Sequence, residues 1–262
     1  MVVASGVWHL DGVIKLLHDL EFTAPGALVR AAMVGVCYML WNVSSVVMIV
    51  QGFREKSYGM PLLGLSAVLA VDLVALYGPF SGQSHLFYYK EDYLLLGVWA
   101  LWTLMQGLVY AQFLMYGRSH GHSIPEMERY FYPIAIGLPV TMVVTFWTFV
   151  VYYQDYYVNE ICPIAVLIMS GAYLNELRVR PDLRGLSVAV GWMLAIAQLL
   201  LYSAVVLGDM TDPYPDASFG YGFIYWIYIV TVIMNFTYAV LITRKRRALR
   251  QTAAGSLVPA EA

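Results

Sequence analysis

The sequence predicts an all-α membrane protein: a bundle of seven transmembrane helices with the N-terminus outside and the C-terminus in the cytoplasm. Of its 262 residues, 60% are hydrophobic and 12% are charged, and the mean hydropathy is +0.66. A soluble domain of this length needs more polar surface. Apolar runs of about 20 residues, long enough to cross a bilayer, recur along the chain. Because lipid offers the backbone no hydrogen bonds, these runs are expected to be helices.

The chain divides into three parts. Residues 1–26 combine apolar residues such as Trp8 and Leu16 with charged ones such as Asp11 and Lys15. This predicts a short amphipathic surface helix, too charged to span. Residues 27–247 form the transmembrane domain, and residues 248–262 are expected to be a disordered tail.

Turn-forming residues and aromatic clusters separate the spans in order along the chain. The first follows Pro25-Gly26, the second lies between Pro61 and Gly78-Pro79, and the fourth ends in a tyrosine cluster typical of a membrane interface. The sixth follows Arg180-Pro181, and the seventh follows the proline-rich segment 212–216. The expected spans are 27–51, 61–80, 93–117, 130–153, 160–177, 185–207 and 221–243.

The distribution of basic residues predicts the orientation. Alternate connections carry 12 of the 15 Lys and Arg residues, and the opposite connections carry only Lys15, Arg30 and Lys90. The positive-inside rule places the basic set in the cytoplasm. This set comprises Arg54, Lys56, Arg118, Arg129, Arg178, Arg180, Arg184, Arg244, Lys245, Arg246, Arg247 and Arg250.

Asp72 is the candidate catalytic residue. It lies near the middle of the second span, in the apolar run Leu69–Ala75, with no basic residue one helical turn away. Charged groups at membrane depth are costly and usually functional. Apolar surroundings favour the protonated carboxyl, which can act as a general acid. The alternative is a structural carboxyl that forms a hydrogen bond between helices.

Five spans each offer one polar group at a similar depth, about 13–20 Å from the cytoplasmic ends at about 1.5 Å per residue. These residues are Asn42, Asp72, Gln106, Gln198 and Asn235. The same spans carry the aromatic residues Trp41, Trp99, Trp102, Tyr110, Trp192, Tyr202 and Tyr238. The hypothesis is one central cavity with aromatic walls around a carboxyl. Ordinary interhelical hydrogen bonding is the alternative.

A buried acid among aromatic rings suits carbocation chemistry. The acid protonates an alkene or an epoxide, the π faces stabilise the cation, and the dry site prevents early quenching. A proton-coupled transporter would use the same parts. A second acid could assist, and Asp209 is the outer acid nearest a span. Most of the outer acids are expected to be solvated loop charges: Asp155, Glu160, Asp209, Asp212 and Asp216. Glu176 is expected to pair with Arg178 or Arg180.

The first cytoplasmic loop resembles a known family. The stretch from Gly52 to Leu65 contains Arg-Glu-Lys-x-Tyr-Gly-Met-Pro at residues 54–61, followed by an acid inside the membrane. This is similar to the small membrane-bound terpene cyclases, which include fungal meroterpenoid and indole-diterpene cyclases and bacterial relatives of the drimentine type. The resemblance covers roughly residues 27–247.

The resemblance implies acid-initiated cyclisation of a prenyl chain, such as farnesyl, attached to an acceptor such as a cyclodipeptide or a polyketide. It implies no cofactor and no metal site, in agreement with the absence of an Asp-Asp-x-x-Asp motif from the sequence. The expected partners are membrane lipid, the prenylated substrate and an upstream prenyltransferase, and no nucleic acid.

The resemblance also assigns positions. Asp72 falls where the family has Glu, Val68 where it has Asn, and Val71 where it has Trp. Asn235 falls where the family has Asp in its last span, so Asn235 is the second candidate catalytic residue. The candidate substrate-binding residues are Asn42, Trp41, Trp99, Trp102, Gln106, Trp192, Gln198, Tyr238 and Asp209.

Two other classes compete with a cyclase. A transporter usually shows internal repeats, and none is clear between the first and last three spans. A retinal-based light sensor needs Lys in the last span, where residues 221–243 have none. The expected location is a membrane crossed several times: the bacterial cell membrane, favoured by the excess of Arg over Lys, or the endoplasmic reticulum of a fungus.

Overall fold

The computed structural model describes residues 27–81, 93–119, 128–153, 155, 160–211 and 221–255. This part of the chain contains seven α-helices and two short 3-10 helices, Gly78–Phe80 and Gly117–Ser119, and no strand. The α-helices are α2 (Ala27–Glu55), α3 (Leu62–Tyr77), α4 (Tyr93–Tyr116), α6 (Phe131–Tyr153), α7 (Ile161–Val179), α8 (Val188–Thr211) and α9 (Tyr221–Gly255).

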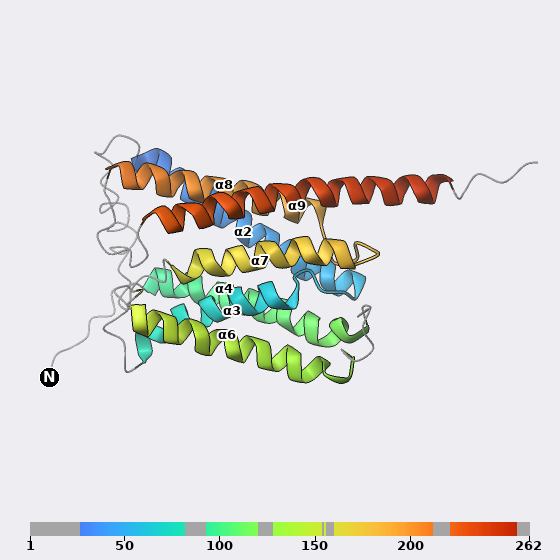
Figure 1. The fold of residues 1–262 in the computed structure, drawn as a ribbon, viewed down its shortest axis with the longest axis horizontal. Helices are drawn as coiled ribbons and strands as arrows, with labels where there is room; N and C mark the ends of the chain where they lie inside the picture. Colours follow the sequence, from blue (N-terminus) through green and yellow to red (C-terminus); the bar gives the residue numbers. More distant parts are fainter. Residues whose placement is uncertain are drawn as a thin grey trace, which may run out of the picture.

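The helices lie side by side along one axis, and α9 extends beyond the others (Figure 1). Helix α3 packs against α4, α6 and α7, while α2 and α9 both pack against α8. In the apolar window of α3, 67% of the residues are buried, against 22% in α2 and in α6. Helix α3, which carries Asp72, is therefore the central helix.

Six helices are long and apolar enough to cross a membrane: α2, α3, α4, α6, α8 and α9. Helix α7 is not among them, because Asn175, Glu176 and Arg178 make its last turns polar. The described chain is thus all-helical, as the sequence predicts, and it crosses the membrane several times. Six of the seven expected spans meet the criteria of length and hydropathy.

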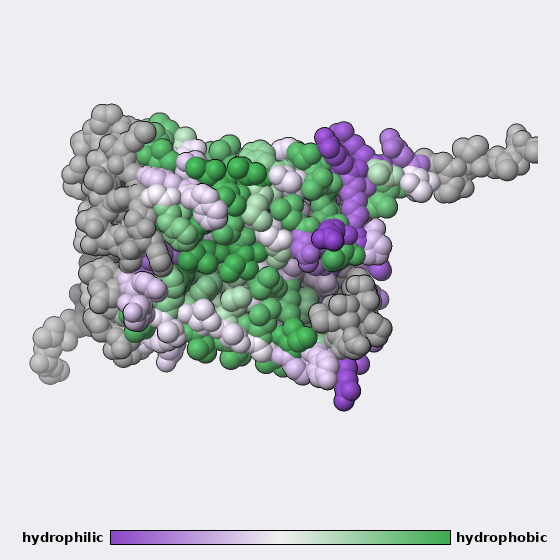
Figure 2. All heavy atoms as spheres, in the orientation of Figure 1, coloured by the Kyte–Doolittle hydropathy of each residue, from purple (hydrophilic) through white to green (hydrophobic). Residues whose placement is uncertain are grey.

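The surface fits this assignment. Figure 2 shows hydrophobic side chains over the middle of the bundle and hydrophilic ones gathered at the end from which α9 extends. Large apolar side chains are exposed along the outer helices, as lipid contact requires. Examples are Val43, Val46, Val50, Ile136, Val140, Val144, Leu104 and Ile233.

Helix α9 continues further than the sequence analysis expects. It reaches Gly255, so residues 248–255, expected to be part of a disordered tail, are helical. Ala248, Leu249 and Arg250 favour helix strongly, and this explains the extension. Residues 256–262 and the expected surface helix at residues 1–26 lie outside the described residues.

Two acids near the start of α7 also differ from expectation. Asp155 and Glu160 are buried rather than solvated, with 6% and 4% of their surface exposed. The Oδ2 atom of Asp155 accepts hydrogen bonds from the backbone N–H groups of Glu160 and Ile161. These donors have no partner within the helix, so Asp155 stabilises the beginning of α7.

We call the end of the bundle where α2 ends and α3 begins the basic end, and the opposite end the far end. At the basic end, the last residue of α2 and the loop 56–61 are joined to the α7–α8 loop by partly buried polar contacts. Glu55 Oε2 accepts a 2.6 Å hydrogen bond from the backbone N–H of Gly185, and Ser57 Oγ donates to the carbonyl of Arg184. Gly185 has φ of +77°, and Tyr58 O would lie 2.4 Å from an added Cβ. Glycine is therefore required there.

Arg180 and Lys245 complete this junction. The guanidinium of Arg180 lies 3.8 Å from the centre of the Tyr58 ring, and its Nε is 2.5 Å from Oε1 of Glu176, a pairing that the sequence analysis predicts. Lys245 of α9 donates to the backbone carbonyls of Leu177 and Arg180. The basic end thus ties α2, α3, α7, α8 and α9 together and fixes the helices around the site.

Candidate active site

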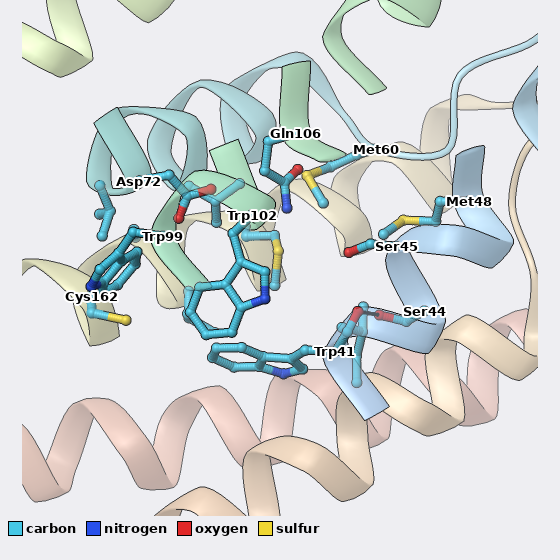
Figure 3. A pocket seen from close by; sticks show the side chains of 16 residues that line it. Trp41, Ser44, Ser45, Met48, Met60, Asp72, Trp99, Trp102, Gln106 and Cys162 are labelled. Atoms are coloured by element: carbon cyan, nitrogen blue, oxygen red, sulfur yellow. Dashed lines mark hydrogen bonds between the residues drawn. The ribbon is translucent and has the colours of Figure 1, made fainter. Parts of the chain in front are cut away.

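A cavity with about 590 Å³ of empty space, part of which opens outward, lies among α2, α3, α4, α7 and α8 (Figure 3). Its lining is mostly apolar and aromatic, with a few polar groups. The lining residues are Trp41, Ser44, Ser45, Met48, Met60, Val68, Val71, Asp72, Trp99, Trp102, Gln106, Cys162, Ala165, Val166, Met169 and Leu194.

Among the described residues that line the cavity, only Asp72 has a carboxyl. The residue is 5% exposed, and its Oδ2 has no hydrogen-bond partner among the described residues. The described part of this lining contains no Lys, Arg or His. The structure therefore places Asp72 at an internal cavity and separates it from any compensating charge in that lining.

Three tryptophans form a continuous aromatic wall beside Asp72. The rings of Trp99 and Trp102 meet edge to face, with centres 5.2 Å apart and planes at 85°. The centres of Trp102 and Trp41 are 5.8 Å apart. Such rings present electron-rich faces that attract positive charge. The sequence analysis names all three as candidate binding residues, and the structure brings them together with Asp72.

Polar contacts support this wall. Nε1 of Trp102 donates a 3.2 Å hydrogen bond to Oδ1 of Asn42, which joins α4 to α2. Asn42 in turn donates from Nδ2 to the carbonyl of Tyr38, one turn earlier. Gln106 lines the cavity, and its buried Oε1 has no hydrogen-bond partner among the described residues. Asn42 therefore contacts the tryptophan wall without lining the cavity, whereas Gln106 lines the cavity itself.

Four other predicted residues do not line this cavity. Asn235, 2% exposed, accepts a 3.1 Å hydrogen bond from Ser170 between α9 and α7. Tyr238 is buried against Tyr173, with ring centres 5.0 Å apart. Gln198 is 1% exposed on α8.

Trp192 is 36% exposed and donates to Thr243. The expected ring of five polar groups is thus divided between the cavity and helix contacts outside it. Asp209 lies on α8, and its side chain is outside the described ones.

The cavity also has walls that the sequence analysis does not single out. Met48 and Met60 lie at its basic end, and Cys162 lies at its far end near Trp99 (Figure 3). An apolar residue of a membrane helix can face lipid, another helix or a cavity, and its hydropathy does not distinguish these three environments. Periodicity alone could not have identified them.

Close packing of α3 on α7 forms the wall behind Asp72. A Cβ added to Gly64 would lie 2.9 Å from the Cα of Met169, so the two backbones meet where no larger residue fits. Met169, Val166 and Ala165 of α7 then face the cavity. Gly64 thus sets the position of this wall relative to α3.

Fold and cavity together define a multi-pass membrane protein with an internal, aromatic-walled acid site. The family model of the Pyr4-like transmembrane terpene cyclases matches residues 23–248. The chain therefore belongs to this family and is a membrane terpene cyclase, as its resemblance predicts. Searches of curated proteins and of solved structures found no match.

Proposed function

We propose that the protein cyclises a prenyl chain, such as farnesyl, attached to an uncharged acceptor, and that Asp72 supplies the initiating proton. The observation that carries this proposal is the buried, unpartnered Oδ2 of Asp72 at a cavity walled by three tryptophans. An isolated charge in such surroundings is costly, so the resting carboxyl is uncharged. A neutral carboxyl is a proton donor.

The proposed reaction is an isomerisation. Asp72 gives its proton either to one carbon of an alkene, whose π bond breaks, or to an epoxide oxygen, whose bond to carbon then breaks. In both cases a cation forms on the carbon that has lost the electron pair. An internal double bond supplies the electron pair for the new carbon–carbon bond. Loss of a proton from the cyclised cation then restores a double bond, and Asp72 regains a proton. Substrate and product therefore have equal mass.

The tryptophans stabilise the travelling cation. Trp99 and Trp102 present faces at nearly right angles, so a cation moving along the chain remains close to a π system. Indole carbons also exclude water, which would trap the cation too early. The contribution of each cation–π contact is about 2 kcal/mol when desolvated.

The substrate is proposed to be uncharged. The lining residues that the structure describes include no Lys, Arg or His to balance a diphosphate. The sequence has no Asp-Asp-x-x-Asp motif, so we propose that initiation needs no metal ion. This agrees with protonation, rather than loss of diphosphate, as the first step.

The proposed topology has seven spans, with α7 as the fifth, the basic end in the cytoplasm and the N-terminus outside. Its support is the hydrophilic end of the bundle from which α9 extends (Figure 2) and the packing of α7 against both α3 and α9. Cysteines introduced singly at Arg129 and at Tyr221, in a chain lacking Cys37 and Cys162, test it by labelling from each side of sealed vesicles.

The activity is tested by incubating membranes that contain the protein with farnesylated aromatic and cyclodipeptide acceptors. We expect an isomer of equal mass, and a mass increase of one unit when the reaction is run in D₂O. A cyclic product without deuterium, or formed from farnesyl diphosphate alone, would contradict protonation by an acid.

A further inference from the structure

Gln106 of α4 lies beside Asp72 of α3 in the wall of the cavity. Both residues line the cavity, and α3 packs against α4. The rings of Tyr116, where α4 ends, and Phe53 of α2 have centres 6.5 Å apart, so α4 ends at the basic end. Asp72 lies about ten residues after the start of α3, and Gln106 about ten before the end of α4, which places both about 15 Å from the basic end. Figure 3 accordingly shows the two side chains next to each other.

Each of these side chains has a buried oxygen that lacks a hydrogen-bond partner among the described residues. These atoms are Oδ2 of Asp72 and Oε1 of Gln106. Two acceptors cannot bond to each other directly. An amide, however, carries an acceptor and a donor at two ends of nearly the same shape. A half-turn of the Gln106 amide therefore puts Nε2 where Oε1 lies and presents an N–H donor to the carboxyl.

Gln106 is also the best placed donor in this wall. It has the only amide among the described lining residues. Nε1 of Trp102 already donates to α2, and the indole nitrogen of Trp99 is turned away from Asp72 in Figure 3. Ser45 lies on the α2 side of the cavity, beyond Gln106 as seen from Asp72 (Figure 3).

A donor at this position matters most when the proton leaves Asp72. The O–H bond then breaks, and its electron pair remains on a carboxylate in an apolar wall. A hydrogen bond to a charged oxygen is about twice as strong as one to a neutral oxygen, so the N–H group stabilises the carboxylate more than the acid. Such a bond lowers the barrier to proton transfer and adds nothing to the binding of the substrate.

We propose that Gln106 is a positioning residue for Asp72: its Nε2–H group donates to one carboxyl oxygen, and the other oxygen carries the proton and faces the prenyl chain. The proposal rests on the proposed function. It gives Gln106 a part in proton transfer in place of the contact with substrate that the sequence analysis expects.

Infrared spectroscopy of the unreacted full-length protein tests the hydrogen bond. The carbonyl band of the neutral Asp72 carboxyl is isolated in each protein by subtracting the spectrum of the same protein with Asp72→Asn. We expect the band to lie at higher wavenumber in Gln106→Met, because the carbonyl loses its N–H donor. Leu104→Met, on the exposed face of the same helix, should leave the band in place.

Gln106→Asn, whose shorter side chain no longer reaches the carboxyl, replaces Gln106→Met if the latter does not fold. An unchanged band in the folded variant, or the absence of a neutral carboxyl band from the unaltered protein, would overturn the proposal.

Kinetics separate positioning from substrate binding, with 2-farnesylphenol as the probe. Gln106→Met should lower kcat for isomer formation by about 10- to 100-fold, the range expected for one hydrogen bond to a charged group, and KM should stay within about twofold. A raised KM with an unchanged kcat would make Gln106 a substrate-binding residue and overturn the proposal.

These measurements distinguish the proposal from the proposed function. If the band moves as expected but Asp72→Asn forms isomer at the unaltered rate, the hydrogen bond stands and protonation by Asp72 fails. If Asp72→Asn is inactive but the band does not move in Gln106→Met, protonation by Asp72 stands and the role of Gln106 fails.

Discussion

Tyr58 and Glu176 lie 118 positions apart in the chain, and the tyrosine hydroxyl donates a 2.9 Å hydrogen bond to Oε1 of the glutamate. Arg180 lies against the same ring. Burial raises the pKa of Tyr58 to about 12, partly opposed by the charge of Arg180, so the hydroxyl remains a donor at neutral pH. The sequence motif that carries the family resemblance thus forms a structural junction, and within it only Met60 lines the cavity.

Tyr58→Phe should lower the free energy of unfolding by about 2 kcal/mol, because it removes a buried hydrogen bond to a charged partner. Thermal unfolding in detergent, followed by circular dichroism, measures this. Tyr132→Phe, at a tyrosine that is 48% exposed, is the control and should change little. Equal stability of the two variants would show that the junction does not hold the bundle together.

Gly64→Ala should be destabilising by about 1–3 kcal/mol, because its Cβ would overlap the Cα of Met169. Gly107→Ala is the matched control on α4, where nothing lies within 4 Å of an added Cβ. Alanine favours helix over glycine by about 1 kcal/mol, so the control should stabilise. The contact between α3 and α7 is refuted if both variants stabilise the protein.

Asn42→Ala and Trp102→Phe should each raise the share of prematurely quenched products, because both remove the hydrogen bond that fixes the Trp102 ring. The double variant should resemble Trp102→Phe alone, since the two residues act as one unit. Chromatography of the products with mass detection measures this. Additive changes in the double variant would mean that Asn42 acts elsewhere.

Asn235→Ala should lower the reaction rate less than replacement of Asp72, because Asn235 bonds Ser170 and lies outside the cavity lining. The free energy of unfolding should fall by about 1–3 kcal/mol, with Ser170→Ala giving a similar change. Thr237→Ala, at an exposed position on α9, serves as control. A folded Asn235→Ala protein with no turnover would instead make Asn235 a direct participant.

Much of this account can be read from the sequence because lipid imposes simple rules. Hydropathy and basic residues predict the helices, and an acid in an apolar run predicts the site at Asp72. The partners of Asn235 and Tyr238 could not be predicted. The depth of a residue in the membrane does not show whether its side chain faces the cavity or a neighbouring helix. The helical extension to Gly255 departs from the expectation because chain ends are usually poorly ordered, whereas the alanine and arginine residues here favour helix.

The central claim is that Asp72 delivers the proton, and the rate of isomer formation by Asp72→Asn tests it most directly. Asparagine keeps the shape but cannot donate an acidic proton, so the rate should fall by at least about 100-fold. The unfolding temperature should be retained, and Asp182→Asn, in the α7–α8 loop, should react normally. A folded Asp72→Asn protein that forms isomer at the unaltered rate would contradict the claim.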